Sequence, residues 1–440
     1  MKNMYIKYRL IRNLLLINLI FIFLSCSKSD NPTNSSGTTG PANLIVNINS
    51  TAVTPKVKVT GNDTTVYYLS ATDTLKSVTP GTFVITAYRV DQNPAGNDLI
   101  GKSFGDLNPV RKINIKAGET KSINIDYVEF PGSGMCWVSD DNGSRLLAFD
   151  KNSITSPGAP APAVKIQFSF EGPRGIAFDK MGDLWVAGFS KNRIFAFSPE
   201  QLSGNTTASP AVTLTNNSIS GPIGLIFDIK GDLWISNWTT GLLVAYKPST
   251  LINMLSSPGS VSNSPDIQIT SANLTEPEYM AFDALGNLWV AGKDPSTNNA
   301  DLLKFSAINL GSSGNISPSI TITESSTPTL INVTALAFDK NGNLWGTDGN
   351  SFFRFSASQL KSSGATVPQF YRSVPAPSLL IGLAFDAQAN LWMGETYTPR
   401  LIRYTYPNSG YGTTYNTSSD LDEPTWIVFF PPPPGYLIYY

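Results

Sequence analysis

The chain has 440 residues, with 31 basic and 32 acidic side chains, two cysteines and no histidine. A net charge of −1 provides no basic surface that would recruit nucleic acid. The absence of histidine excludes Ser-His and Cys-His nucleophilic catalysis, a histidine general base and histidine-ligated zinc.

The first residues have the pattern of an export signal. Four basic side chains precede the apolar run 14–24, which is about half the length that a membrane-spanning helix needs. The sequence Phe23-Leu24-Ser25-Cys26 then resembles the lipobox of bacterial lipoproteins. The resemblance implies that residues 1–25 are a lipoprotein signal peptide and that acylated Cys26 anchors the mature chain to a membrane. Ser27, in place of the aspartate that favours inner-membrane retention in that family, implies an outer-membrane lipoprotein that faces the periplasm or the cell surface. A plain secreted protein is the alternative.

Two segments follow the signal. Residues 26–41 contain no large apolar side chain after Cys26, which predicts a flexible tether. Short runs in which apolar residues recur with a period of two, such as Leu44, Val46 and Ile48, predict a small antiparallel β-sandwich over residues 42–128. The run 78–87 and the hairpin sequence 117–125 are similar to PEGA-like and carboxypeptidase-regulatory-like sandwiches. That resemblance implies a spacer or adhesive module.

Residues 96–103 match the P-loop pattern G-x-x-x-x-G-K-[ST]. A phosphate-binding loop needs a buried parallel strand before it and a helix after it. The residues that follow, 104–109, contain Gly105 and Pro109 and do not favour a helix. We therefore interpret the match as accidental and expect no nucleotide partner.

The remaining chain, residues 129–440, is organised by a repeat. The phrase Phe178-Asp-Lys-Met-Gly-Asp-Leu-Trp185 returns with its tryptophan at Trp234, Trp289, Trp345 and Trp392, and Trp137 precedes the series, at intervals of about 50 residues. Each copy has two apolar runs around a tight turn, and two further strands complete the unit, which predicts an all-β fold whose four-stranded units are the blades of a β-propeller. The run 423–429 matches the first strand that the Trp137 unit lacks, so we expect six blades, closed by the C-terminal strand. A seventh would arise if residues 436–440 formed a further strand. The repeats resemble six-bladed NHL-type and gluconolactonase-like propellers.

The repeated aspartates allow two interpretations. They are Asp179, Asp228, Asp283, Asp339 and Asp386. One carboxylate in each separate turn does not provide the six to eight oxygens that calcium prefers, whereas an aspartate readily caps its own turn. We expect turn caps and no metal in the turns, with calcium as the alternative.

The direction of the strands predicts where a ligand would bind. The aspartate turns lie on one face of the propeller, and the variable loops lie around the channel mouth on the other. The candidate binding residues there are Asp140, Asp141, Arg174, Phe189, Asn237, Trp238, Glu278, Tyr279, Lys293, Asp348, Glu395 and Trp426. Ordinary solvated loops are the alternative interpretation.

Two functions fit this pattern. The first is a lipid-anchored binding or scaffolding module for a glycan, peptide or protein partner, without catalytic residues or a cofactor. The second is a calcium-dependent lactonase or other hydrolase, as the gluconolactonase resemblance implies, for which Glu278, Asn237, Asp348 and Glu395 are the candidate ligands. A related lyase group depends on histidine and is excluded. We favour binding, because separate loops do not by themselves form a carboxylate cluster.

Overall fold

The computed structural model describes residues 40–168, 172–297, 299–323, 330–406 and 413–435. Residues 41–440 belong to one compact unit. The expected signal peptide, Cys26, nearly all of the tether and the segment 436–440 lie outside the described residues. Among the helices of the described residues, none is long and apolar enough to cross a membrane.

Residues 42–129 form three small sheets. The strands are β1 (Ala42–Asn49), β2 (Lys56–Thr60), β3 (Val66–Leu69), β4 (Asp73–Val78), β5 (Gly81–Tyr88), β6 (Val90–Gln92), β7 (Lys102–Gly105), β8 (Val110–Ile115), β9 (Thr120–Asp126) and β10 (Val128–Glu129). The sheets β4-β1-β9 and β3-β2-β5-β8 share one apolar core that includes Leu44, Val59 and Phe83. Their strands pair antiparallel except for β1 and β9, which run parallel.

The third sheet, β10-β7-β6, contains the end of the P-loop-like sequence. Lys102 and Ser103 lie in β7 rather than at the start of a helix. Lys102 Nζ is paired with Glu129 Oε2 at 2.8 Å, and Ser103 Oγ donates to Asp91 Oδ1 at 2.5 Å. Both side chains therefore interact with neighbouring strands of their own sheet.

Six sheets of four or five strands follow in the described part of the chain. The first is β38 (Pro424–Phe430), β11 (Met135–Asp140), β12 (Arg145–Asp150), β13 (Val164–Gln167) and β17 (Asn205–Thr207). The second is β14 (Pro173–Phe178), β15 (Leu184–Gly188), β16 (Arg193–Phe197), β18 (Val212–Leu214) and β22 (Gly259–Val261). The third is β19 (Pro222–Phe227), β20 (Leu233–Asn237), β21 (Leu242–Tyr246), β23 (Ile267–Thr270) and β27 (Gly314–Asn315).

The other three sheets repeat the same order. The fourth is β24 (Met280–Phe282), β25 (Leu288–Lys293), β26 (Ala300–Phe305), β28 (Ile320–Thr323) and β32 (Gly364–Ala365). The fifth is β29 (Val333–Phe338), β30 (Leu344–Asp348), β31 (Ser351–Phe355) and β33 (Phe370–Ser373), and the sixth is β34 (Leu380–Phe385), β35 (Asn390–Glu395), β36 (Arg400–Thr405) and β37 (Thr413–Asn416). Short helices lie in the connections: η1 (Lys151–Ile154), η2 (Phe189–Lys191), η3 (Pro199–Leu202), α2 (Pro248–Leu255), η4 (Ala307–Asn309) and η5 (Gln359–Lys361).

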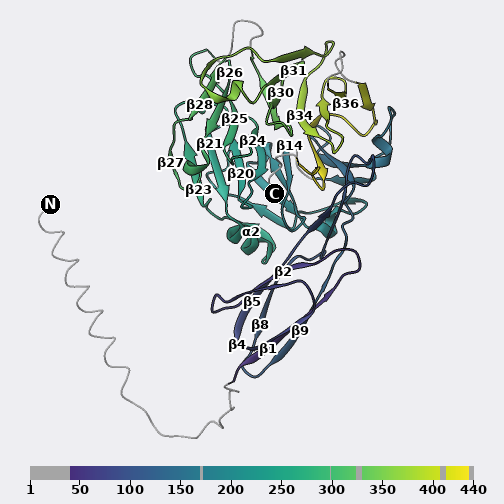
Figure 1. Cartoon of the computed structure of the whole chain (residues 1–440), viewed down its shortest axis with the longest axis vertical. Helices are drawn as coiled ribbons and strands as arrows, with labels where there is room; N and C mark the ends of the chain where they lie inside the picture. The colour runs from purple at the N-terminus through teal and green to yellow at the C-terminus, as the bar shows by residue number, and fades with distance from the viewer. Residues whose placement is uncertain (1–39, 169–171, 298, 324–329, 407–412, 436–440) are drawn as a thin grey trace, which may run out of the picture. The chain divides into compact units, whose positions relative to one another are not determined.

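The first strands of the six sheets form a closed ring. Each contacts the next in the cycle β38, β14, β19, β24, β29, β34 and back to β38, and the sheets are arranged around this centre (Figure 1). The C-terminal strand β38 pairs antiparallel with β11, with Trp137 opposite Val428. The chain is therefore a β-propeller, and the predicted closure beside Trp137 is confirmed.

The aspartate of the repeated turn is hydrogen-bonded to a buried tryptophan. Asp386 Oδ1 accepts the backbone N–H groups of Gln388 and Asn390, and Asp386 Oδ2 accepts Nε1–H of Trp392 at 2.8 Å. In each of the other four copies the aspartate accepts the equivalent three hydrogen bonds: from the backbone N–H groups two and four residues later and from the indole N–H six residues later. The prediction of turn caps is confirmed, and the indole bond six residues along the chain is an addition to it.

Each turn also has a residue with positive φ at an equivalent position of the repeat. Gly182 has φ of +95°, and a β-carbon there would lie 2.5 Å from the Phe130 ring. The last copy has Ala389 in this place, with φ of +64°. All six repeat tryptophans are buried, as is the free thiol of Cys136, whose pKa is raised by burial. Cys136 is thus a packing residue, as predicted.

Candidate binding site

The twelve candidate residues lie where second strands end and first strands begin. Eleven of them separate into two groups, and the twelfth, Lys293, pairs with Glu276. One group is a set of four polar side chains, each three residues after a repeat tryptophan: Asp140, Asn237, Asp348 and Glu395. They end β11, β20, β30 and β35, and all four are buried. Their hydrogen bonds show that they connect the chain to itself.

Two of these four hold the segment that enters a first strand. Asp140 Oδ1 accepts the backbone N–H of Glu423 at 2.5 Å, and Asp140 Oδ2 accepts Nε–H of Arg145 at 2.7 Å. Asp348 Oδ1 accepts the backbone N–H groups of Asn332 at 2.7 Å and Ile331 at 3.1 Å. Burial raises the pKa of both carboxyl groups, and these hydrogen bonds oppose the rise.

Of the other two, Asn237 acts in the same way, whereas Glu395 bonds the loop between its own second and third strands. Asn237 Oδ1 accepts the backbone N–H of Ser220 at 2.9 Å, and its Nδ2 donates to the carbonyl of Leu242 at 3.1 Å. Glu395 accepts the backbone N–H of Thr398 at 3.0 Å and forms an ion pair with Arg400 at 2.7 Å. All four side chains therefore cap loops of the propeller.

The second group surrounds Arg174, at the start of β14. Arg174 Nη2 forms an ion pair with Asp141 Oδ2, and its guanidinium carbon lies 5.6 Å from the ring centre of Phe189. Phe189 in turn meets Trp238 edge to face, with ring centres 6.3 Å apart. Asp141, Phe189 and Trp238 follow the second strands of three consecutive sheets, so the cluster extends across neighbouring blades.

Glu278 is a half-buried acid of the same cluster. Burial raises its pKa to about 7, and the positive charges of Arg174 and Lys293 oppose the rise. Its backbone is held on both sides, because its N–H donates to the carbonyl of Ala291 and its carbonyl accepts from Ser236 Oγ. Lys293 is paired with Glu276 at 2.7 Å, and Glu276 has the unusual φ of +45°.

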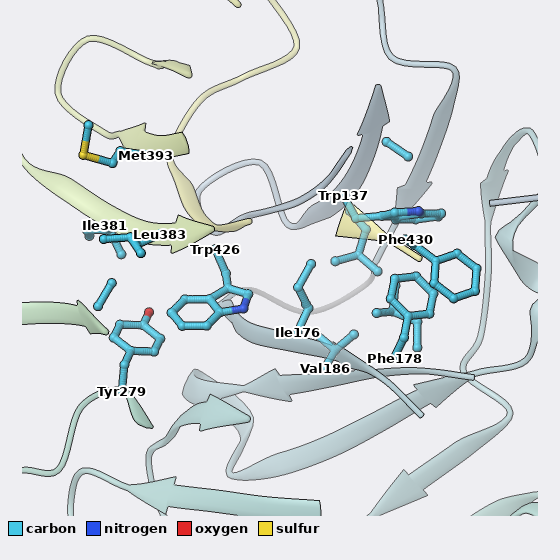
Figure 2. Close-up of a cluster of buried hydrophobic side chains, with 14 of the residues drawn as sticks. Trp137, Ile176, Phe178, Val186, Tyr279, Ile381, Leu383, Met393, Trp426 and Phe430 are labelled. Carbon is cyan, nitrogen blue, oxygen red and sulfur yellow. The ribbon is translucent and has the colours of Figure 1, made fainter. Parts of the chain in front are cut away.

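Tyr279 and Trp426 form the aromatic floor of the cluster. Their rings stack with centres 4.3 Å apart and planes inclined by 16°, and Ile381 and Leu383 lie beside them (Figure 2). Burial raises the pKa of Tyr279, and the charge of Arg174 opposes this rise. Trp426 also lines a central apolar cavity of about 120 Å³, to which all six first strands contribute.

Two donors of this cluster lack a hydrogen-bond acceptor among the described residues. They are Nε of Arg174 and Nε1 of Trp426, and both atoms are buried. Buried donors normally have a partner, so each unpaired donor indicates either strain or an acceptor from outside the chain. We use the name Arg174 cluster for Asp141, Arg174, Phe189, Trp238, Glu278, Tyr279 and Trp426.

Some partners were not among the candidates. Glu423 belongs to the same electrostatic group, because burial and the charge of Asp141 raise its pKa while Arg174 opposes the rise. Arg145 and Arg400 pair with Asp140 and Glu395. These pairs have a sequence signal that was overlooked: an arginine begins the third strand five residues after the acid that ends the second.

The described residues do not support the calcium set. Asn237, Asp348 and Glu395 end strands in three different sheets and are bonded to their own loops. In the parts of the chain that the structure describes, no three carboxylate, cysteine or histidine side chains converge as metal ligands would. The candidate ligands therefore do not fit a calcium ion.

No family model matches the chain, and no curated protein matches it. Among solved structures, selenomethionine-substituted virginiamycin B lyase from Staphylococcus aureus is 16% identical, with a TM-score of 0.42 over 67% of this chain and 84% of the other. A putative gluconolactonase is also 16% identical, with a TM-score of 0.38 over 60% and 83%. A protein of unknown function from Bacteroides caccae is 10% identical, with a TM-score of 0.41 over 67% and 97%. The assignment to the β-propellers follows from this chain's own sheets and ring.

Proposed function

We propose that this protein is a lipid-anchored, extracytoplasmic binding module and that the Arg174 cluster receives its ligand, a glycan or a peptide segment of a partner protein. The observation that carries the proposal is the pair of buried, unpaired donors, Arg174 Nε and Trp426 Nε1. They accompany the partly exposed rings of Phe189 and Trp238 and the acid Glu278. Donors for carbonyl or hydroxyl oxygens, combined with aromatic surface, suit a saccharide or a peptide.

Binding to panels of glycans and peptides tests this proposal, with the chain from residue 27 onward as the sample. Two variants remove the unpaired donors and retain most of the packing: Trp426→Phe and Arg174→Gln. We expect each to weaken binding by roughly tenfold, the effect of losing one hydrogen bond to a buried group. Lys361→Gln is the matched control, because Lys361 is exposed in η5 of another blade. Ligands that bind both variants as tightly as the unmodified chain would refute this site.

The anchor is a separate part of the proposal and has its own test. Expression in a bacterium supplied with labelled palmitate should label the chain, and Cys26→Ala should abolish the label. Membrane fractionation then distinguishes an outer-membrane protein from a secreted one. A chain that stays unlabelled and soluble would refute the lipid anchor without affecting the binding site.

We do not propose the lactonase function. Its chemistry would depend on a calcium ion, and three of the four candidate ligands are bonded to their own loops, as described above. No described group of acids replaces them.

A further inference from the structure

The repeat places an arginine at the start of the third strand in three of the six sheets. These residues are Arg145, Arg193 and Arg400, the first residues of β12, β16 and β36. In β12 and β36 the guanidinium Nε lies 2.7 Å from an acid that ends the second strand. The repeat thus contains a built-in ion pair in two blades.

In the second sheet the acid is missing. The pairing register places Arg193 opposite Gly188, as it places Arg145 opposite Asp140 and Arg400 opposite Glu395. The ring of Phe195 covers Gly188, and a β-carbon at Gly188 would lie 2.4 Å from Phe195 Cε2. An acidic side chain could therefore not occupy this place without displacing the ring.

As a result, no acid among the described residues of its blade neutralises Arg193. Arg193 and its neighbour Lys191 are both exposed, and neither forms an ion pair with any described residue. Two cations on one turn repel each other, so an anion between them would be favoured.

The two cations border a pocket of about 530 Å³, which is within the usual size of small-molecule sites. Its base is a row of three residues in register across adjacent strands: Phe195 on β16, Thr213 on β18 and Ser260 on β22. The opposite wall is the segment 207–210, which begins at the end of β17 in the neighbouring sheet. Among the described residues that line this pocket, none is acidic.

We propose that this pocket, between the first and second sheets, binds an acidic saccharide, with the sugar carboxylate at Arg193 and Lys191. Thr213 and Ser260 supply hydroxyl groups that can donate to or accept from the hydroxyl groups of the sugar. Ala208 and Pro210, which are partly exposed, supply apolar surface for the carbon face of the ring. This site shares no residue with the Arg174 cluster and does not depend on it.

Calorimetric titration of the purified full chain with trigalacturonate, with neutral galactotriose and with inorganic sulfate tests the proposal. We expect the uronate to bind. The neutral sugar should bind at least roughly tenfold more weakly, because it lacks a charge-assisted contact. Added salt should lower the affinity for the uronate. Absence of uronate binding at millimolar concentration would overturn the proposal. Equal binding of uronate and neutral sugar, or of uronate and sulfate, would overturn the assignment to an acidic sugar.

Variants then locate the site. Arg193→Gln removes the charge from an exposed position. It should lower the affinity for the uronate by roughly tenfold without changing the melting temperature. Ser260→Leu keeps the charges but fills the pocket, and this variant should abolish uronate binding. Lys361→Gln makes the same charge change in another blade and should bind as the unmodified chain does. Retained affinity in Arg193→Gln, or an equal loss in Lys361→Gln, would show that the pocket is not the site.

Discussion

Replacement of Asp386 by alanine should destabilise the propeller strongly. Asp386 is fully buried and accepts four hydrogen bonds: from the backbone N–H groups of Gln388 and Asn390, from Asn390 Nδ2 at 2.8 Å and from Trp392 Nε1 at 2.8 Å. Alanine leaves these donors without an acceptor in a closed environment. Each unpaired donor costs about 1–3 kcal/mol, but removal of a buried carboxylate returns part of this cost as relief of desolvation. We therefore expect the free energy of unfolding to fall by about 3–5 kcal/mol.

The chain contains a matched comparison for this change. Asp228 occupies the same place in the third sheet, but it is only half-buried and lies 3.4 Å from Trp234 Nε1. Water can replace its bonds, so Asp228→Ala should cost about 1–2 kcal/mol. Urea unfolding followed by tryptophan fluorescence measures both changes. A loss below about 1 kcal/mol for Asp386→Ala, or an equal loss for Asp228→Ala, would show that the bond to the buried indole is not what stabilises the turn.

Three further predictions concern Glu278, Cys136 and the effect of calcium. Glu278 has a pKa raised to about 7 in the folded chain, so the unfolded chain releases this proton at lower pH. Stability should therefore fall as the pH rises from about 4.5 to 7. Glu278→Gln should make this fall in melting temperature smaller, and the remainder belongs to other acids with a raised pKa, such as Asp140 and Asp348. Arg174, Lys293 and Glu276 face the same group, so Glu276→Gln serves as a control that should retain the fall. Cys136 is buried, and we expect a thiol reagent to modify it only after addition of urea; rapid modification of the folded chain would contradict the packing of β11. Calcium or a chelator should leave the melting temperature unchanged, because Asn237, Asp348 and Glu395 are bonded to their loops; a calcium-dependent rise would contradict that interpretation.

The fold could be predicted because its signals are local. The aspartate turn, the apolar runs and the tryptophan lie within eight residues, and each hairpin is specified by that stretch alone. Closure of the ring is a long-range contact, but it was predictable because residues 423–429 repeat a first strand that the Trp137 unit lacks. The indole bond to the aspartate was equally visible in the constant spacing of six residues and was not recognised.

The site was less predictable, because its members are distinguished by contacts distant in sequence. Asp140 and Asp141 are neighbours, yet Asp140 accepts a backbone N–H from Asp422, 282 residues away, whereas Asp141 pairs with Arg174. Nothing in the local sequence distinguishes a carboxylate that caps a distant loop from one that faces a ligand. Residue type and loop position therefore placed four loop caps among the twelve candidates.

Departures from the repeat help to distinguish side chains that could bind a ligand from those that bond within the blade. Residue type alone does not make this distinction. Where the repeat is intact, as at Asp140 with Arg145 and Glu395 with Arg400, the polar side chains neutralise each other inside the blade. Where it fails, the described residues leave charge without its regular partner: Gly188 stands opposite Arg193 in place of an acid, and the entry to β24 holds the half-buried Glu278, whose pKa is raised. A fold built from equivalent units has no structural need for these exceptions, because the neighbouring blades show that the regular solution is stable. Unused charge at an exception is therefore better evidence for a ligand than the same residue types in a regular copy.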